Sequence, residues 1–195
     1  MSMGSHWSIA DRLHQDSTGS QIVEFAVALP LLLVLVVGIF DFGNAFNLKQ
    51  KLTNATRDAA RLGAGQATSD LSNAPPPSIL ALRDVVANYM QNAKIDNCSL
   101  GSAAATPAGA STPWKWTFTS ACPLGGNLVV TVNRANVFLG SVTTAGNAIK
   151  VISTEVTISY PYVWQFNRVI KLLAPSASYP GTTQIITDAV VANES

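Results

Sequence analysis

Residues 25–40 read FAVALPLLLVLVVGIF, an unbroken apolar run with Glu24 directly before it and Asp41 directly after it. At 1.5 Å per residue, a helix over this run is about 24 Å long, which is shorter than the roughly 30 Å of bilayer hydrocarbon. Continuation through Phe46 brings the helix to a full span. The run therefore predicts one transmembrane helix over about residues 21–46.

A secretory signal peptide is the alternative explanation of this run. Such a peptide begins with a basic segment and ends at a small-residue cleavage site. Here only Arg12 precedes the run, Glu24 lies against it, and the nearest small-residue candidate, Gly43-Asn44-Ala45, fits poorly. These features favour the transmembrane helix.

The helix is expected to continue beyond the membrane. Apolar residues recur at spacings of three and four, which predicts a narrow apolar seam on one helix face. The seam consists of Ala45, Leu48, Leu52, Ala55, Ala59 and Leu62. Gly63 and Gly65 then supply a typical end signal. Pro30 lies inside the apolar run, where it frees the carbonyl of Ala26 and favours a local kink. We predict one helix over residues 20–65.

Composition narrows the possible functions. Charged residues make up 12% of the chain, about half the roughly 25% of an average soluble domain, which is typical of membrane or exported chains. The formal net charge is +1, so no general electrostatic attraction to nucleic acid is expected. No glycine-rich phosphate loop is present either.

Two motifs resemble the TadE-like family, the minor pseudopilins of the tight-adherence (Tad, or Flp) type IV pilus system. The first is Gly19-Ser20-Gln21-Ile22-Val23-Glu24-Phe25, followed by an apolar helix that Pro30 interrupts. The second is the stretch NATRDAARLGA at residues 54–64, which resembles the family's post-membrane pattern of alanines and arginines. The resemblance covers about residues 19–65.

The resemblance implies a prepilin-type peptidase that cuts between Gly19 and Ser20, so residues 1–19 would be a leader peptide. Glu24 would then lie about one helical turn from the new amine of Ser20. A carboxylate near hydrocarbon needs a partner, and the resemblance implies the amine of an adjacent subunit. Pairing of Glu24 with its own chain's Ser20 amine, or with headgroups, is the alternative. Glu24, Phe25 and Pro30 are the expected assembly residues.

The charges that flank the run favour a different orientation from the family's. Lys49, Lys51, Arg57 and Arg61 follow the span and only Arg12 precedes it, which by the positive-inside rule places the C-terminal part in the cytoplasm. The family has this part outside the cytoplasm. We expect the family orientation, because the two cysteines, Cys98 and Cys122, favour an oxidising compartment.

The rest of the chain predicts a small α+β domain with an antiparallel sheet. Residues 66–78 have the composition of a linker, and residues 79–94 show helical spacing with Ser78 as a candidate cap. Alternating patterns predict strands near residues 114–119, 128–132 and 152–160, the last ended by Pro161. Residues 163–173 are expected to be helical or interfacial. Trp164 and Phe166, with Arg168 and Lys171 nearby, could contact headgroups, but core and rim roles are commoner. Residues 184–192 fit a last strand, with helix as the alternative.

The cysteine pair predicts a disulfide between Cys98 and Cys122. Closing a loop of about 25 residues stabilises a fold by roughly 3 kcal/mol in the chain-entropy model. Two unrelated buried thiols are the alternative.

The sequence offers little for catalysis. The only histidines, His6 and His14, lie in the predicted leader. Without them a Ser/His/Asp triad, a Cys/His pair and a histidine zinc site are excluded, and two cysteines are too few for a thiolate metal site. We expect no enzymatic activity, no cofactor and no bound metal.

The resulting hypothesis is a membrane-anchored pseudopilin-like subunit of a Tad-type pilus or related filament, with residues 79–195 outside the cytoplasm. Its expected partners are prepilin peptidase, other pilins or pseudopilins, the assembly machinery and membrane lipid. The alternative is an uncleaved single-pass membrane protein whose outer domain binds a ligand or partner.

Overall fold

The structure is a computed structural model. It describes residues 17–194 except for residues 73, 110–113, 145–146, 174–175 and 177–180. The predicted leader thus lies outside the described residues, apart from its last three. The chain forms two compact units. We call residues 17–42 with the described part of residues 165–179 the anchor unit, and the remaining described residues the sheet unit.

The long N-terminal helix α2 runs Ser17–Gly65, so the predicted continuous helix is confirmed. Pro30 lies inside it, and helical structure continues on both sides of the proline. Residues 17–42 of α2 belong to the anchor unit and residues 43–65 to the sheet unit. The anchor unit also contains the helix α4, Phe166–Leu173, which confirms helix for residues 166–173 of the predicted stretch 163–173.

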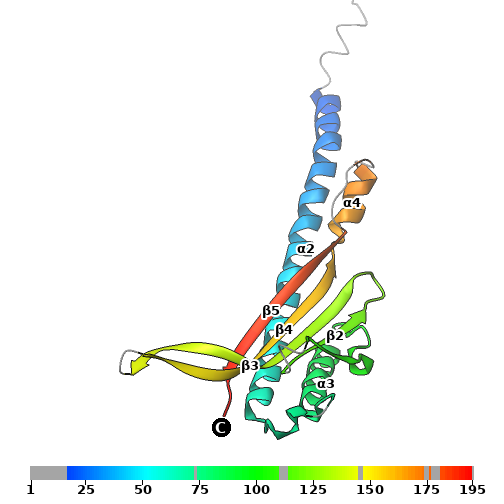
Figure 1. Ribbon diagram of the computed structural model, residues 1–195. Coiled ribbons are helices and arrows are strands. Elements are labelled where there is room, and N and C mark those ends of the chain that lie inside the picture. Colours follow the sequence, from blue (N-terminus) through cyan, green and yellow to red (C-terminus); the bar gives the residue numbers. More distant parts are fainter. Residues whose placement is uncertain are drawn as a thin grey trace, which may run out of the picture. The chain divides into compact units, whose positions relative to one another are not determined.

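The sheet unit contains a five-stranded antiparallel sheet in the order β1-β2-β3-β4-β5, so each strand pairs with its sequence neighbour (Figure 1). The predicted α+β fold, a long helix followed by a small antiparallel domain, is confirmed. The strands are β1 (Ala105–Pro107), β2 (Lys115–Ala121), β3 (Asn127–Thr144), β4 (Asn147–Val163) and β5 (Thr182–Ala192).

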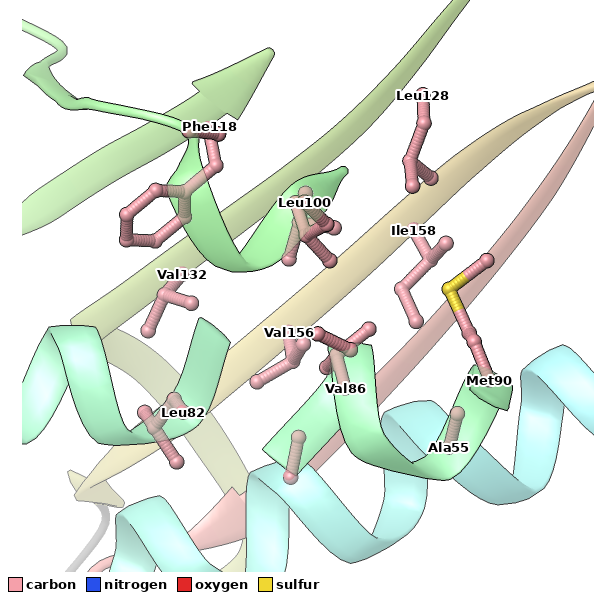
Figure 2. Close-up of a cluster of buried hydrophobic side chains, with 14 of the residues drawn as sticks. Ala55, Leu82, Val86, Met90, Leu100, Phe118, Leu128, Val132, Val156 and Ile158 are labelled. Carbon is pink, nitrogen blue, oxygen red and sulfur yellow. The ribbon is translucent and has the colours of Figure 1, made fainter. Parts of the chain in front are cut away.

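One face of the sheet supplies the core. Its inward residues line up across the strands in two rows, because antiparallel register places every second residue on the same face. The rows are Trp116–Val132–Val156–Ala189 and Phe118–Val130–Ile158–Thr187, and all eight residues are buried. Side chains of α2 and of helix α3 (Pro77–Asn92) complete the core, among them Ala55, Leu82, Val86 and Met90 (Figure 2).

The start of α3 differs from the prediction. Pro76 is the N-cap and makes no side-chain cap hydrogen bond, whereas Ser78, the predicted cap, lies inside the first turn. Proline at the first helical position suits a helix start because its missing N–H would be unpaired there anyway. Asp70 takes over the capping, since its carboxylate accepts from the Ser78 N–H at 2.6 Å and from the Ser78 hydroxyl at 3.0 Å.

Part of the segment predicted as a linker, residues 66–78, has local structure and contacts the core. It contains the 3₁₀ helix η1, Ser69–Ser72, and Leu71 within η1 is buried. A second 3₁₀ helix, η2, spans Leu100–Ser102 and buries Leu100.

The prediction that Pro161 ends its strand is wrong, because β4 continues to Val163 and pairs Pro161 with Gln184 of β5. The last residue pair of β4 with β3 is Val129 with Ser159. Beyond Ser159 only one edge of β4 is therefore paired, and a residue without an N–H is tolerated there. Residues 184–192 lie in β5, which confirms the strand and excludes the helix alternative.

The C-terminal end of α2 is held by the last residues of the described chain. The N–H of Glu194 donates to the carbonyl of Ala64 at 3.0 Å, which satisfies one of the acceptors left free at a helix end. Lys51 in α2 donates to the carbonyl of Ala93 at the end of α3, also at 3.0 Å. A cation at a helix C-terminus is favourable because the helix dipole is negative there.

Candidate functional site

The anchor unit exposes the apolar face predicted to span a membrane. α2 is the helix that is long and apolar enough to cross a bilayer, and none of its most apolar window is buried inside the described structure. Phe25 is 60% exposed and Leu31 is 71% exposed. In water such a surface would be strongly unfavourable, so it requires lipid or another protein to cover it.

The predicted processing site lies at the beginning of α2. Gly19 and Ser20 are both exposed, and apart from the adjoining residues and the helix's own backbone no atom lies within 4 Å of the position that a Cβ on Gly19 would occupy. The helix here is therefore held by its own backbone hydrogen bonds, and no described part of the chain covers the peptide bond between the two residues.

Glu24 lies one turn further along the same helix. Its side chain is exposed and has no hydrogen bond or ion pair with any residue that the structure describes. Its neighbours Val23 and Phe25 are exposed apolar residues. The structure thus brings Gly19, Ser20, Glu24 and Phe25 together on the first turns of one helix, with a carboxylate among apolar side chains.

The post-membrane motif divides between two faces of α2. Its small residues face the core, and the buried ones are Ala55, Thr56, Ala59, Ala60, Gly63 and Ala64. Arg57 and Arg61 are exposed. The buried face of the helix is wider than the predicted apolar seam. It does not include Leu62, a predicted seam residue, which is 39% exposed. The alanines of this motif therefore serve close packing, since small side chains let the sheet and α3 approach the helix.

The predicted disulfide between Cys98 and Cys122 is present. It joins the turn after α3 to the residue that follows β2. The N–H of Cys98 also donates to the Asp96 carboxylate at 2.8 Å, and the Ser120 hydroxyl donates to the Cys98 carbonyl. The disulfide therefore belongs to a local network that fixes α3 against the sheet.

The most buried cation of the described chain, Arg134, was not singled out by the sequence reasoning. Arg134 is 1% exposed and donates to the carbonyls of Gln66 and Ala67, at 2.6 and 3.2 Å, and to the Ser78 hydroxyl at 3.1 Å. Burial lowers the pKa of Arg134, and the nearby Asp70 carboxylate partly opposes this effect. A signal was available, because Arg134 continues the inward alternation that Val130 and Val132 establish.

A register shift in β3 between Asn133 and Asn136 accompanies the buried arginine. Bulges of this kind re-aim side chains. The guanidinium ties β3 to the end of α2 and the start of α3, which makes Arg134 a structural residue of the sheet unit.

Asp41 was noted in the sequence only as the boundary of the apolar run. In the structure it is 2% exposed, and its carboxylate accepts from the N–H of Phe166, the first residue of α4, at 2.8 Å. An acidic residue flanked by Phe40 and Phe42 in an apolar helix was the available signal.

Comparison with known proteins agrees with the motifs. Neither curated proteins nor solved structures give a match to this chain. A protein-family model does match, and it is the model of the TadE-like protein family, over residues 19–61. This range begins at the predicted processing glycine and ends within the alanine and arginine motif. The resemblance predicted from those residues is confirmed: the segment that carries Gly19, Glu24 and the packed alanines of α2 is TadE-like.

Proposed function

We propose that this chain is a minor pseudopilin-like subunit, anchored in the cytoplasmic membrane, that takes part in assembling a Tad-type pilus or a related surface filament. It carries out no reaction of its own. The observation that carries the proposal is Glu24, an acidic side chain exposed on the apolar segment of a TadE-like helix, without a partner among the described residues.

The argument from Glu24 is one of charge compensation. A carboxylate at the edge of the hydrocarbon costs a few kcal/mol on insertion scales unless it is paired. A neighbouring subunit that has been cleaved before Ser20 would offer a new N-terminal amine one helical turn from its own Glu24. Pairing between the two chains would neutralise both groups and fix the register of adjacent helices.

The surroundings of Gly19 support processing by a prepilin peptidase. A peptidase needs an extended peptide bond, whereas Gly19 and Ser20 are helical here. The first turn of a helix lacks intrahelical partners for its N–H groups and opens at low cost. No tertiary contact opposes this opening at Gly19.

Two features support a domain outside the cytoplasm. The disulfide between Cys98 and Cys122 requires an oxidising compartment to persist. Lys51, one of the basic residues that argue for the reverse orientation, is engaged by the carbonyl of Ala93 and so has a structural role.

The N-terminus of the mature protein tests the proposal most directly. Full-length chain expressed with a prepilin peptidase should yield a protein that begins at Ser20, measured by intact mass. Gly19→Val should block the cleavage, because a branched side chain next to the scissile bond hinders an extended fit. Normal filament assembly by a chain that retains Met1 would instead favour an uncleaved single-pass protein whose outer domain binds a partner.

Glu24→Gln tests the pairing itself. The variant keeps the shape of the side chain but removes its charge, so membrane insertion should persist while recovery with partner subunits falls tenfold or more, equivalent to about 1.4 kcal/mol. Gln21→Ala, at another exposed polar position of the same segment, is the matched control and should co-purify as the parent does. Equal recovery of Glu24→Gln and the parent would contradict the pairing.

A further inference from the structure

The helix α4 is attached to the membrane segment through Asp41. The N–H of Phe166 donates to the Asp41 carboxylate at 2.8 Å, so Asp41 occupies the N-terminal end of α4. Such a contact is favourable because the first N–H groups of a helix lack partners and the helix dipole is positive there. Both elements belong to the anchor unit.

The depth of Asp41 in the membrane follows from the length of the apolar run. The run before Asp41 covers about 24 Å, short of the roughly 30 Å of hydrocarbon, so a full span includes Phe42 and extends toward Phe46. Asp41 then lies at the edge of the hydrocarbon, where an unpaired carboxylate is unfavourable. The N-terminus of α4 removes this difficulty, since it hydrogen-bonds the carboxylate and leaves it only 2% exposed.

Side-chain contacts place α4 against the apolar face of α2. A Cβ on Gly38 would lie 3.6 Å from the ring of Phe166, so the ring packs where α2 has no side chain. A shallow apolar hollow of the anchor unit, lined in part by Leu35, Gly38 and Ile39, adjoins the same ring. α4 therefore lies alongside the last turns of the apolar run.

The sequence of α4 is amphipathic. Phe166, Val169 and Ile170 recur at spacings of three and four, whereas Lys171 is exposed and basic. Val169 and Ile170 are only half-buried within the described structure. A short helix with an apolar side, a basic residue and a position at the end of a membrane span fits the water–lipid interface.

We propose that α4 is an interfacial helix that lies at the boundary between hydrocarbon and headgroups of the membrane that α2 crosses, beside the last turns of the apolar run. Val169 and Ile170 contact the upper acyl chains, and Lys171 faces lipid phosphates. The exposed side of α4 is thus covered by lipid, because Asp41 holds α4 at the depth where the hydrocarbon ends. This inference rests on the proposed membrane anchoring of α2 and adds a second membrane contact that fixes how deeply α2 sits.

Depth-resolved fluorescence quenching tests the proposal on the full chain. Both native cysteines are engaged in the disulfide, so an introduced cysteine can be labelled alone with an environment-sensitive fluorophore. The positions are Ile170→Cys in α4, Leu32→Cys in the apolar run and Thr119→Cys at an exposed site of β2. The vesicles contain phosphatidylcholine and phosphatidylglycerol with lipids spin-labelled at a shallow or a deep acyl position.

The expected pattern differs at each position. The label at Ile170 should be quenched severalfold more by shallow than by deep spin labels, the label at Leu32 more by deep ones, and the label at Thr119 by neither. Quenching at Leu32 with none at Ile170 would overturn the interfacial role of α4 and leave the anchoring intact. Absence of quenching at Leu32 would overturn the anchoring of α2 and this inference with it.

Asp41→Ala separates α4 docking from simple anchoring. Loss of the cap should release α4, so shallow quenching at Ile170 should fall severalfold while quenching at Leu32 stays unchanged. Asp58→Ala, at an exposed acidic site of α2 in the sheet unit, is the control and should change neither value. Unchanged quenching at Ile170 in the Asp41→Ala protein would overturn the role given to Asp41.

Discussion

Residues 17–42 of α2 carry mostly large apolar side chains that are exposed, whereas the buried face of residues 43–65 consists mostly of small residues. Leu31 in the first segment is 71% exposed, and Ala55 in the second is fully buried. Large side chains offer area to lipid or to a partner, while alanine and glycine let the backbone of the helix approach a sheet. The buried face of the second segment is thus built mainly from small residues, with Leu52 as its large member.

The largest expected effect on stability comes from Arg134, whose hydrogen bonds hold residues 43–65 of α2 in place. Arg134→Ala removes the donors for the carbonyls of Gln66 and Ala67 at the end of α2 and leaves a cavity. We expect the free energy of unfolding to fall by about 3 kcal/mol, from lost charged hydrogen bonds and lost packing. Urea unfolding of the full chain in detergent, followed by tryptophan fluorescence, measures this.

Two controls sharpen the test of Arg134. Arg134→Met keeps most of the volume, so it should lose less stability than the alanine variant. Arg61→Ala, at an exposed arginine of α2, should stay within about 0.5 kcal/mol of the parent. An Arg134→Ala protein as stable as Arg61→Ala would show that the guanidinium network does not hold α2 to the sheet.

Much of this fold could be predicted because its patterns are local. The apolar run, the alternation in β2 to β5 and the spacing in α3 each depend on neighbouring residues alone. The role of Asp70 could not be predicted, because it caps a helix that begins seven residues later and competes with the nearer Ser78. The passage of β4 through Pro161 depends on where β3 stops pairing, which is a tertiary property.

The residues of the candidate site likewise fall into those that local sequence could identify and those that it could not. Gly19 and Glu24 could be identified because a processing motif is contiguous in sequence. The contact between Asp41 and Phe166 joins residues 125 positions apart, so no local pattern could reveal it. The buried side of the second segment was predicted one position off at its end, where Gly63 faces the core and Leu62 does not.

Gly63→Ala should have an intermediate effect on stability, because it tests the close packing of residues 43–65 of α2. A Cβ at Gly63 would lie 2.8 Å from the Thr154 methyl and 3.0 Å from a Leu82 methyl, closer than packed atoms allow. We expect a loss of about 1–2 kcal/mol in unfolding free energy, since overpacking outweighs the better helix propensity of alanine. Gly43→Ala is the matched control, because outside its own helix backbone and adjoining residues no atom lies within 4 Å of its Cβ position. Equal stability of the two variants would contradict close packing at Gly63.

The smallest expected effect on stability concerns Tyr160, a partly buried residue at the edge of the hydrophobic core. Burial of Tyr160 raises its pKa above the ordinary value of 10.0, with a further contribution from the Asp96 carboxylate. The unfolded chain then loses this proton at lower pH than the folded chain, so stability should be unaffected by Tyr160 near pH 7 and should fall as the pH rises through about 10. Tyr160→Phe should lessen that fall, measured by urea unfolding at about pH 7 and about pH 10.5. If the parent and Tyr160→Phe lose the same stability between these two conditions, the phenol is solvated and the core ends short of Tyr160.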